Sequence, residues 1–156
     1  MLRSTYDNQR CAVAWSLEVV GERWTLLIVR DALLGATRFG EFRARLGITA
    51  SVLAARLDRL VTAGVLERVP YHSQPTRYEY RLTASGKELA LVVLSLMSWG
   101  DRHFTGHRVP PKAAFHDGCG GRVQPRLQCC LCHVEVPPDQ IVIRSVRGRT
   151  PAHSGV

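Results

Sequence analysis

Hydrophobic residues recur along the first part of the chain with the spacing of short amphipathic helices. Apolar side chains three or four positions apart form one stripe on each of four consecutive segments, and a glycine closes every one of them. The last segment begins at Thr49, whose hydroxyl is a good helix cap. The pattern predicts four helices, over residues 12–20, 22–34, 39–46 and 49–62.

After Gly64 the apolar residues alternate with polar ones, as they do on a strand with one buried face. Residues 65–71 and 77–83 show this alternation, and the stretch HSQPT between them is rich in turn-forming residues. The first of the two strands fits the pattern with either of its faces inward. A helical spacing returns over residues 84–104. The predicted order is four helices, a two-stranded hairpin and a long helix.

The apolar stripes predict which side chains form the core. They are Val13, Leu17 and Val20; Trp24, Leu27, Ile28 and Leu34; Phe39, Phe42 and Leu46; Leu53, Leu57, Leu60 and Val61; and Leu89, Val93, Leu96 and Met97. The first and the last of these helices hold more apolar residues than a domain of this size buries by itself. We therefore expect a partner surface there, and a symmetric dimer is the simplest one.

Two short helices joined by a tight turn and followed by a hairpin make a winged helix-turn-helix. In such motifs the second helix enters the major groove of DNA. The outward face of residues 49–62 begins with small, uncharged residues and carries arginine later, so its leading end is slim enough to approach base edges. An ordinary surface helix, or a helix that packs against another helix, can show the same pattern of outward residues. We expect DNA contacts from Arg38, Arg43, Thr49, Ser51, Val52, Ala55, Arg56, Arg59 and Arg77.

The charge balance agrees with a polyanionic partner without proving one. The chain has 156 residues, of which 46% are hydrophobic and 22% charged, as is typical of a folded protein. Its 21 Lys and Arg outnumber 13 Asp and Glu, which gives a net charge of +8. No apolar run approaches the ~20 residues of a membrane span. The amino end has no signal-peptide pattern, so we expect a cytoplasmic location.

The composition changes near Thr105, where prolines, glycines and cysteines become frequent. We divide the chain into a winged-helix and dimerisation domain over residues 1–104, a zinc-ribbon-like domain over 105–143, and a flexible basic end over 144–156. A tail with so few large apolar residues needs another source of stability, such as a bound metal.

The tail contains two pairs of metal-binding residue types with the spacing of zinc knuckles. His116 and Cys119 form one pair, and Cys129 and Cys132 form the other. Together they make a tetrahedral set of three sulfurs and one nitrogen with no open position, which predicts a structural zinc ion. Cys130 and His133 compete for places in this set. The alternative is a loose tail with four free, reduced thiols.

Several motifs make the chain resemble the HxlR-type regulators, which are relatives of the MarR group. They are Cys11, WTLLIVRDALLG (24–35), RFGEFRARL (38–46), ITASVLAARLDRL (48–60), GVLERV (64–69), YEYRLTASG (78–86) and SWG (98–100). The resemblance implies a bacterial transcription regulator that dimerises through its first and last helices. It also implies a recognition helix and a wing in each subunit. The family often has a basic residue where this chain has Val52, which leaves the base preference open.

The resemblance also gives meaning to the cysteines. Some members of the family use an amino-terminal cysteine as a redox sensor, so Cys11 is a candidate sensor. A small buried residue in the dimer interface is the reading that we favour, because no neighbouring feature marks this thiol as activated. Some members append a zinc ribbon like the tail described above.

These observations lead to one functional prediction and its alternatives. We expect a mainly α winged helix-turn-helix protein that binds double-stranded DNA in a sequence-specific way. It would act as a homodimer on an inverted repeat, with repression as the expected output. The alternative is a winged helix used as a protein-interaction module. We do not expect an enzyme, because no nucleophile stands in an activating motif and no phosphate-binding loop is present.

Overall fold

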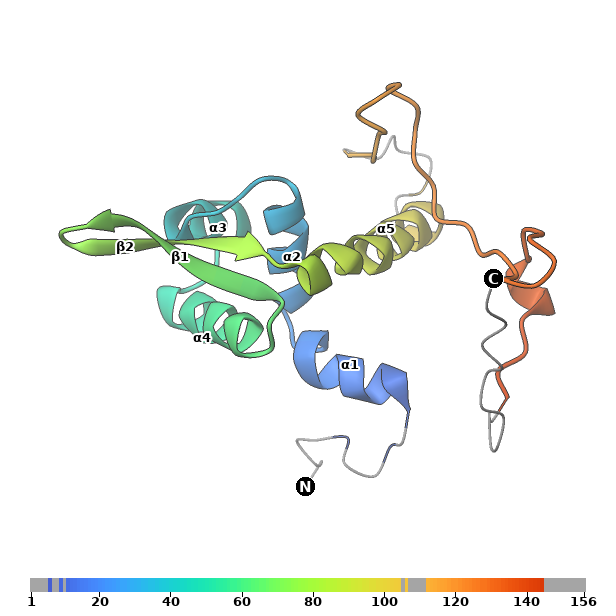
Figure 1. Ribbon diagram of the computed structural model, residues 1–156, viewed down its shortest axis with the longest axis horizontal. Coiled ribbons are helices and arrows are strands. Elements are labelled where there is room, and N and C mark those ends of the chain that lie inside the picture. Colours follow the sequence, from blue (N-terminus) through green and yellow to red (C-terminus); the bar gives the residue numbers. More distant parts are fainter. Residues whose placement is uncertain (1–5, 7–8, 10, 105, 107–111, 145–156) are drawn as a thin grey trace, which may run out of the picture.

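The computed structural model describes residues 6, 9, 11–104, 106 and 112–144. Figure 1 shows a helical body with a projecting hairpin at one side and a long tail at the other. The predicted order of four helices, hairpin and long helix is confirmed. The elements are α1 (Ala12–Val20), α2 (Thr25–Leu33), α3 (Phe39–Leu46), α4 (Ala50–Thr62), β1 (Leu66–Ser73), β2 (Thr76–Leu82), α5 (Ala84–Phe104) and the 3-10 helix η1 (Pro138–Gln140).

Helices α3 and α4 form a helix-turn-helix whose turn is only three residues long. Gly47 ends α3 in the left-handed conformation, with φ of 63°, which glycine adopts at little cost. Ile48 is buried and anchors the turn to the core. Thr49 then caps α4, since its hydroxyl accepts a hydrogen bond from the Val52 amide at 3.4 Å. The turn therefore fixes the direction in which α4 leaves it.

Strands β1 and β2 pair in an antiparallel hairpin that forms the wing. The register runs from Leu66 opposite Leu82 to Ser73 opposite Thr76, with a bulge between Pro70 and His72. The Tyr80 amide donates to the Thr37 carbonyl at 2.7 Å, just before α3 begins. The wing is therefore attached to the helix-turn-helix at its base and projects beyond it (Figure 1).

The core lies where α2, α3, α4, α5 and the base of the wing meet. The predicted stripe on α4 is confirmed, because Leu53, Leu57 and Leu60 are all fully buried. The stripe on α2 is partly wrong. Leu27 and Leu34 are exposed, because α2 turns the face of Thr25, Ile28 and Val29 inward. The core consists of Ile28, Val29, Ala36, Phe42, Ile48, Leu53, Leu57, Leu60, Val65, Leu66, Tyr80 and Val93.

Helix α2 also places a charged side chain in the interior. Asp31 is buried, and one of its carboxylate oxygens pairs with the neighbouring Arg30 at 2.9 Å. The pairing keeps this buried carboxylate from being an isolated charge. The sequence pattern did not single out Asp31.

Helices α1 and α5 leave large apolar side chains in solvent. Leu91 on α5 is 61% exposed, and Val13 on α1 is 68% exposed. Further exposed apolar residues on these helices are Trp15, Leu17, Val92, Leu96, Trp99 and Phe104. We call this set the α1–α5 apolar surface. No helix among the described residues is long and apolar enough to cross a membrane.

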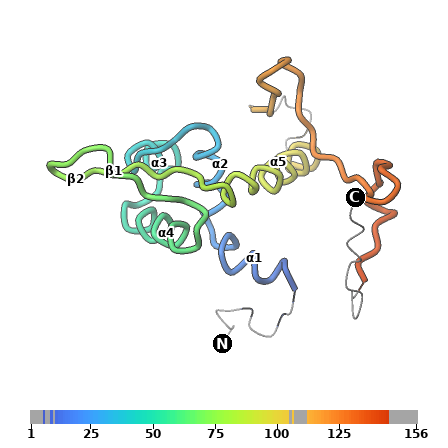
Figure 2. Tube along the Cα trace, viewed as in Figure 1, coloured from blue at the N-terminus to red at the C-terminus, as the bar shows by residue number. Residues whose placement is uncertain are grey.

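The tail after α5 follows a winding path with two tight loops (Figure 2). The predicted basic end at 144–156 lies outside the described residues, except for Arg144.

The buried face of α4 should dominate the stability of the body. We expect Leu57→Ala to lower the free energy of unfolding by about 2–5 kcal/mol, because it leaves a cavity in a closed core. Chemical denaturation followed by circular dichroism measures the change. Arg43→Ala, on an exposed position of α3, is the control and should shift the value by less than about 0.5 kcal/mol. An equal loss in both variants would contradict the placement of the core.

Candidate nucleic-acid interface

The leading end of α4 is bare of charge and open to solvent. Ser51, Val52 and Ala55 are exposed, and no charged side chain precedes Arg56 on this helix. The Thr49 hydroxyl lies 3.3 Å from the Ser51 hydroxyl, so the polar groups at this end are small. Because the buried leucines occupy the opposite face, the exposed residues point away from the body. The helix therefore has the exposed, uncharged leading end that its residue pattern predicts.

The two arginines of α4 are held by acidic residues outside the helix. Arg59 Nη1 lies 2.5 Å from Glu22 Oε1, and Arg59 Nη2 donates to the Glu18 carbonyl at 2.5 Å. Arg56 pairs with the other carboxylate oxygen of Glu22 and also donates to the Arg23 carbonyl at 3.4 Å. Glu22 thus bridges both guanidinium groups.

This bridge was not foreseen, and it changes the role of Arg56 and Arg59. Both side chains are turned toward the junction of α1 and α2 rather than left free at the surface. Glu22 and Arg59 are 37 positions apart in the sequence, so local charge spacing carries no signal of their pairing. Only the packing of α4 beside the end of α1 reveals the pairing. We call Glu22, Arg56 and Arg59 the Glu22 bridge.

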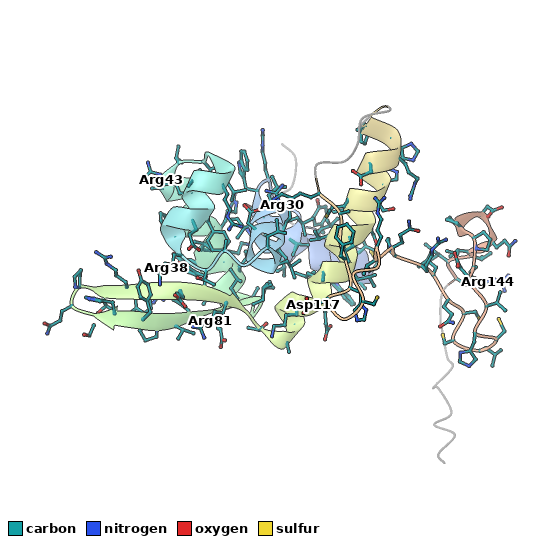
Figure 3. All side chains as sticks on the ribbon, turned by 90° about the horizontal axis from the view of Figure 1, so that it is seen from above. Arg30, Arg38, Arg43, Arg81, Asp117 and Arg144 are labelled. Atoms are coloured by element: carbon teal, nitrogen blue, oxygen red, sulfur yellow. The ribbon has the colours of Figure 1, made fainter. Side chains whose placement is uncertain are left out.

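Arg38 connects the start of α3 to the wing. Its Nε lies 3.3 Å from Glu79 Oε1 on β2, and its guanidinium lies 4.6 Å from the ring centroid of Tyr71 on β1. Arg81 also pairs with Glu79 at 2.9 Å. The neighbouring Arg81, together with Arg38, lowers the pKa of the Glu79 carboxyl. Figure 3 shows Arg38 and Arg81 along the wing. The two arginines keep this carboxylate charged, and the Arg38 pair connects the wing to the start of α3.

Glu41 fixes the first turn of α3 in a similar way. One of its carboxylate oxygens accepts hydrogen bonds from the Thr37 amide at 2.8 Å and the Arg38 amide at 3.0 Å. The backbone donor of Arg38, followed by that of Thr37, lowers the pKa of the Glu41 carboxyl. Two amides that a helix start leaves without partners are thereby satisfied.

Arg43 and Arg77 differ from the other predicted contacts because their guanidinium groups are exposed and uncommitted. Neither makes an ion pair or side-chain hydrogen bond to a residue that the structure describes. Arg43 lies on α3 (Figure 3), and Arg77 lies near the tip of the wing. Helix α4 contacts both α3 and the hairpin, so the two arginines lie on the two elements that pack against it. Arg68, on the other strand, stacks over the ring of Tyr78 at 4.4 Å.

The four predicted zinc ligands lie in the two loops of the tail. His116 Nδ1 is 3.2 Å from Cys119 Sγ, so the first pair converges. In the second pair, hydrogen bonds from the backbone of Cys132 and then Leu131 lower the pKa of the Cys129 thiol. The two pairs are not brought together. Among the residues that the structure describes, no group of three or more His, Cys, Asp or Glu side chains is placed to hold a metal ion.

Cys11 caps the first helix. Its sulfur accepts a hydrogen bond from the Ala14 amide at 3.4 Å, and the side chain is exposed in the single chain. A position at the start of a helix is where a thiolate would be stabilised. Whether it senses oxidants remains a prediction from the sequence.

Comparison with known proteins places this site in a family. The family model described as HxlR-like helix-turn-helix matches residues 19–108. The chain is 46% identical over 125 residues to an HTH-type transcriptional regulator of Mycobacterium tuberculosis named Rv3095, covering 80% of this chain and 79% of the relative.

Solved structures are similar in both fold and sequence. The crystal structure of PA1607 is 33% identical, has a TM-score of 0.79, and covers 89% of this chain and 97% of its own. The redox regulator HypR in its reduced form is 32% identical, has a TM-score of 0.57, and covers 61% of this chain and 95% of its own. The chain therefore belongs to the HxlR-like helix-turn-helix family and is a DNA-binding transcriptional regulator.

Proposed function

We propose that the chain acts as a homodimer, binds an inverted-repeat operator in a sequence-specific way, and represses transcription from it. The observation that carries this proposal is the exposed, uncharged leading end of α4, with the uncommitted guanidinium groups of Arg43 and Arg77 on the neighbouring α3 and wing. A slim helix end suits the major groove, and cations on either side suit the phosphates that border it.

The residues divide into those that read bases and those that hold the backbone. Val52 and Ala55 offer apolar contact to a thymine methyl group, and the Ser51 hydroxyl can bond a base edge or a phosphate. Thr49 caps the helix, so its own hydroxyl is already occupied by the Val52 amide. Arg43 and Arg77 are the first candidates for phosphate contacts. Arg38 adds a positive charge on the start of α3, although its ion pair with Glu79 partly neutralises this charge.

Arg56 and Arg59 can reach the duplex only by leaving the Glu22 bridge. Breaking these ion pairs has a free-energy cost that offsets part of the gain from a phosphate contact. The cost is smaller than that gain, because the pairs are partly exposed and therefore weak. We infer that the two arginines contribute less to DNA affinity than Arg43 and Arg77 do. They remain candidate contacts of the bound state.

The α1–α5 apolar surface is where a second copy of the chain would sit. It contains large side chains such as Leu91 and Trp99 in an otherwise charged protein, and burying them would release a substantial hydrophobic free energy. A two-fold dimer presents two copies of α4. Its half-sites would lie about 34–36 Å apart, or a multiple of that distance. An occupied operator excludes other proteins from the promoter without any further contact surface, which makes repression the simplest output.

The first test compares arginines of equal charge in different settings. We expect Arg43→Ala and Arg77→Ala each to weaken binding to a selected operator. Each should also reduce the slope of log affinity against log salt by about 1, because one phosphate contact is lost. Arg59→Ala should change the slope less. Fluorescence anisotropy at several salt concentrations measures both quantities, with DNA selected from a random pool.

Arg102→Ala provides the control, because this arginine lies near the end of α5 and bonds Ser98. It removes the same charge but should leave the salt slope unchanged. Binding that no DNA sequence and no salt concentration affects would contradict the proposal. It would favour a protein-interaction module instead.

A second test concerns the Glu22 bridge. Glu22→Gln removes the carboxylate that holds Arg56 and Arg59, so we expect tighter duplex binding and a steeper salt dependence. The free energy of unfolding should change by less than about 1 kcal/mol, because the pairs are partly exposed. The same anisotropy titration and a denaturation curve give both numbers. An unchanged salt slope would show that neither arginine turns to DNA when released.

The third test addresses the dimer. We expect the double variant Leu91→Glu/Leu96→Glu to be monomeric in sedimentation experiments and to bind the operator far more weakly, because charges on the apolar surface oppose its burial. Lys87→Glu introduces acidic charge at an exposed position of the same helix and serves as the control. A double variant that still sediments as a dimer would place the interface elsewhere.

A further inference from the structure

The tail contains the same hairpin twice. The first tail hairpin spans residues 114–123, and the second tail hairpin spans residues 127–136. Each is closed by one antiparallel bridge, Phe115 with Arg122 in the first and Gln128 with Glu135 in the second. The outer hydrogen bonds also correspond: Val123 donates to the Ala114 carbonyl at 2.8 Å, and Val136 donates to the Leu127 carbonyl at 2.8 Å.

The turns inside the two hairpins share two further backbone hydrogen bonds. His116 donates to the Gly121 carbonyl at 2.8 Å, as Cys129 does to Val134 at 3.0 Å. Gly120 donates back to the His116 carbonyl at 2.8 Å, as His133 does to Cys129 at 2.9 Å. In this alignment His116 corresponds to Cys129.

The repeat decides which side chains are equivalent donors. Cys119 and Cys132 occupy the same place, three positions after the first donor of each hairpin. His133 corresponds to Gly120, and both have positive φ, 56° and 69°. His133 is therefore a turn residue. Cys130 corresponds to Asp117, which is not one of the two donors of the first hairpin. The repeat selects His116, Cys119, Cys129 and Cys132 from the six candidate residues.

The first hairpin is shaped around its two donors. His116 Nδ1 and Cys119 Sγ are 3.2 Å apart, which is close enough for both to bind one ion. A Cβ added at Gly121 would meet the Cys119 sulfur at 3.3 Å, and one at Gly118 would meet the His116 ring at 3.1 Å. Side chains at these two positions would crowd the donors, so the glycines keep the space around them open.

Each hairpin offers only two of the four donors that a structural zinc ion requires. Within one chain the hairpins lie apart, as two separate loops joined by an extended stretch (Figures 1 and 2). Arg126 reinforces that stretch, since it pairs with Glu135 at 2.6 Å and donates to Gln124 at 2.9 Å. The single chain therefore holds two half-sites.

We propose that a second copy of this chain completes the sites, so that the first tail hairpin of one protomer and the second tail hairpin of its partner bind one Zn²⁺. This inference rests on the dimer of the proposed function. Two-fold symmetry then gives two equivalent zinc ions per dimer, each with three sulfurs and one nitrogen.

The partner is a second copy because the tail continues directly from the α1–α5 apolar surface. Its hairpins carry their own uncovered apolar side chains, among them Leu131, which is 90% exposed, and Phe115. The match to PA1607 covers 89% of this chain and therefore extends past α5 into the tail. A partner's tail would cover these side chains and supply the missing donors together.

A mixed dimer tests whether the donors come from two chains. One chain carries His116→Ala and Cys119→Ser, and the other carries Cys129→Ser and Cys132→Ser, with different affinity tags for isolation. In the mixed dimer the intact first hairpin of one chain meets the intact second hairpin of the other. We expect native mass spectrometry to find two zinc ions in the parent dimer, one in the mixed dimer, and none in either variant homodimer.

Further measurements make each outcome decisive. Cys130→Ser is the matched control and should keep both zinc ions. Co²⁺ in place of Zn²⁺ should give the thiolate absorption of a tetrahedral site in the parent and in the mixed dimer. A parent dimer with two zinc ions and a mixed dimer with none would place all four donors in one chain and overturn the proposal. A parent dimer without zinc would overturn the site alone, whereas a monomer that binds operator DNA would overturn the dimer.

Discussion

The interface depends on one constraint, the burial of a single face of α4. Leu53, Leu57 and Leu60 are completely enclosed by α2, α3 and the base of the wing. A helix held so firmly on one side has a fixed opposite side, and that side carries Ser51, Val52 and Ala55. The apolar packing therefore does the positioning, and the outward residues can be small because they have no structural task. A recognition surface that is rigid before it meets DNA loses less entropy on binding.

Charge on this surface is distributed by pairing rather than by number. Four arginines of the helix-turn-helix and the wing share two carboxylates: Glu22 holds Arg56 and Arg59, and Glu79 holds Arg38 and Arg81. The pairs link α4 to the α1–α2 junction and the wing to α3. Arg38, Arg56 and Arg59 therefore act first as connectors between elements. Arg43 and Arg77 have no carboxylate partner among the described residues, so they can contact phosphate without first breaking an ion pair.

The sequence predicted the fold closely because the fold is built from local periodicity. Helices α1 and α3 end at a glycine, Thr49 caps α4, and the change of period after Gly64 marks the wing. What periodicity could not supply was the orientation of α2, where Leu27 is exposed and Thr25 buried, or the Glu22 bridge. Both depend on which faces of distant segments meet. The ligand spacing in the tail was visible, but the choice between Cys129 and Cys130 needed backbone hydrogen bonds.

Several features of the single chain lack a partner. One chain has one recognition helix, an uncovered apolar surface on α1 and α5, and two pairs of donors that do not meet. Each is half of something that two-fold symmetry would complete. Because α5 leads directly into the tail, a partner bound along the apolar surface brings its own tail close as well. Hydrophobic burial would then supply the association energy, and metal coordination would fix the geometry. In such a dimer the spacing of the two α4 helices is set far from the DNA itself.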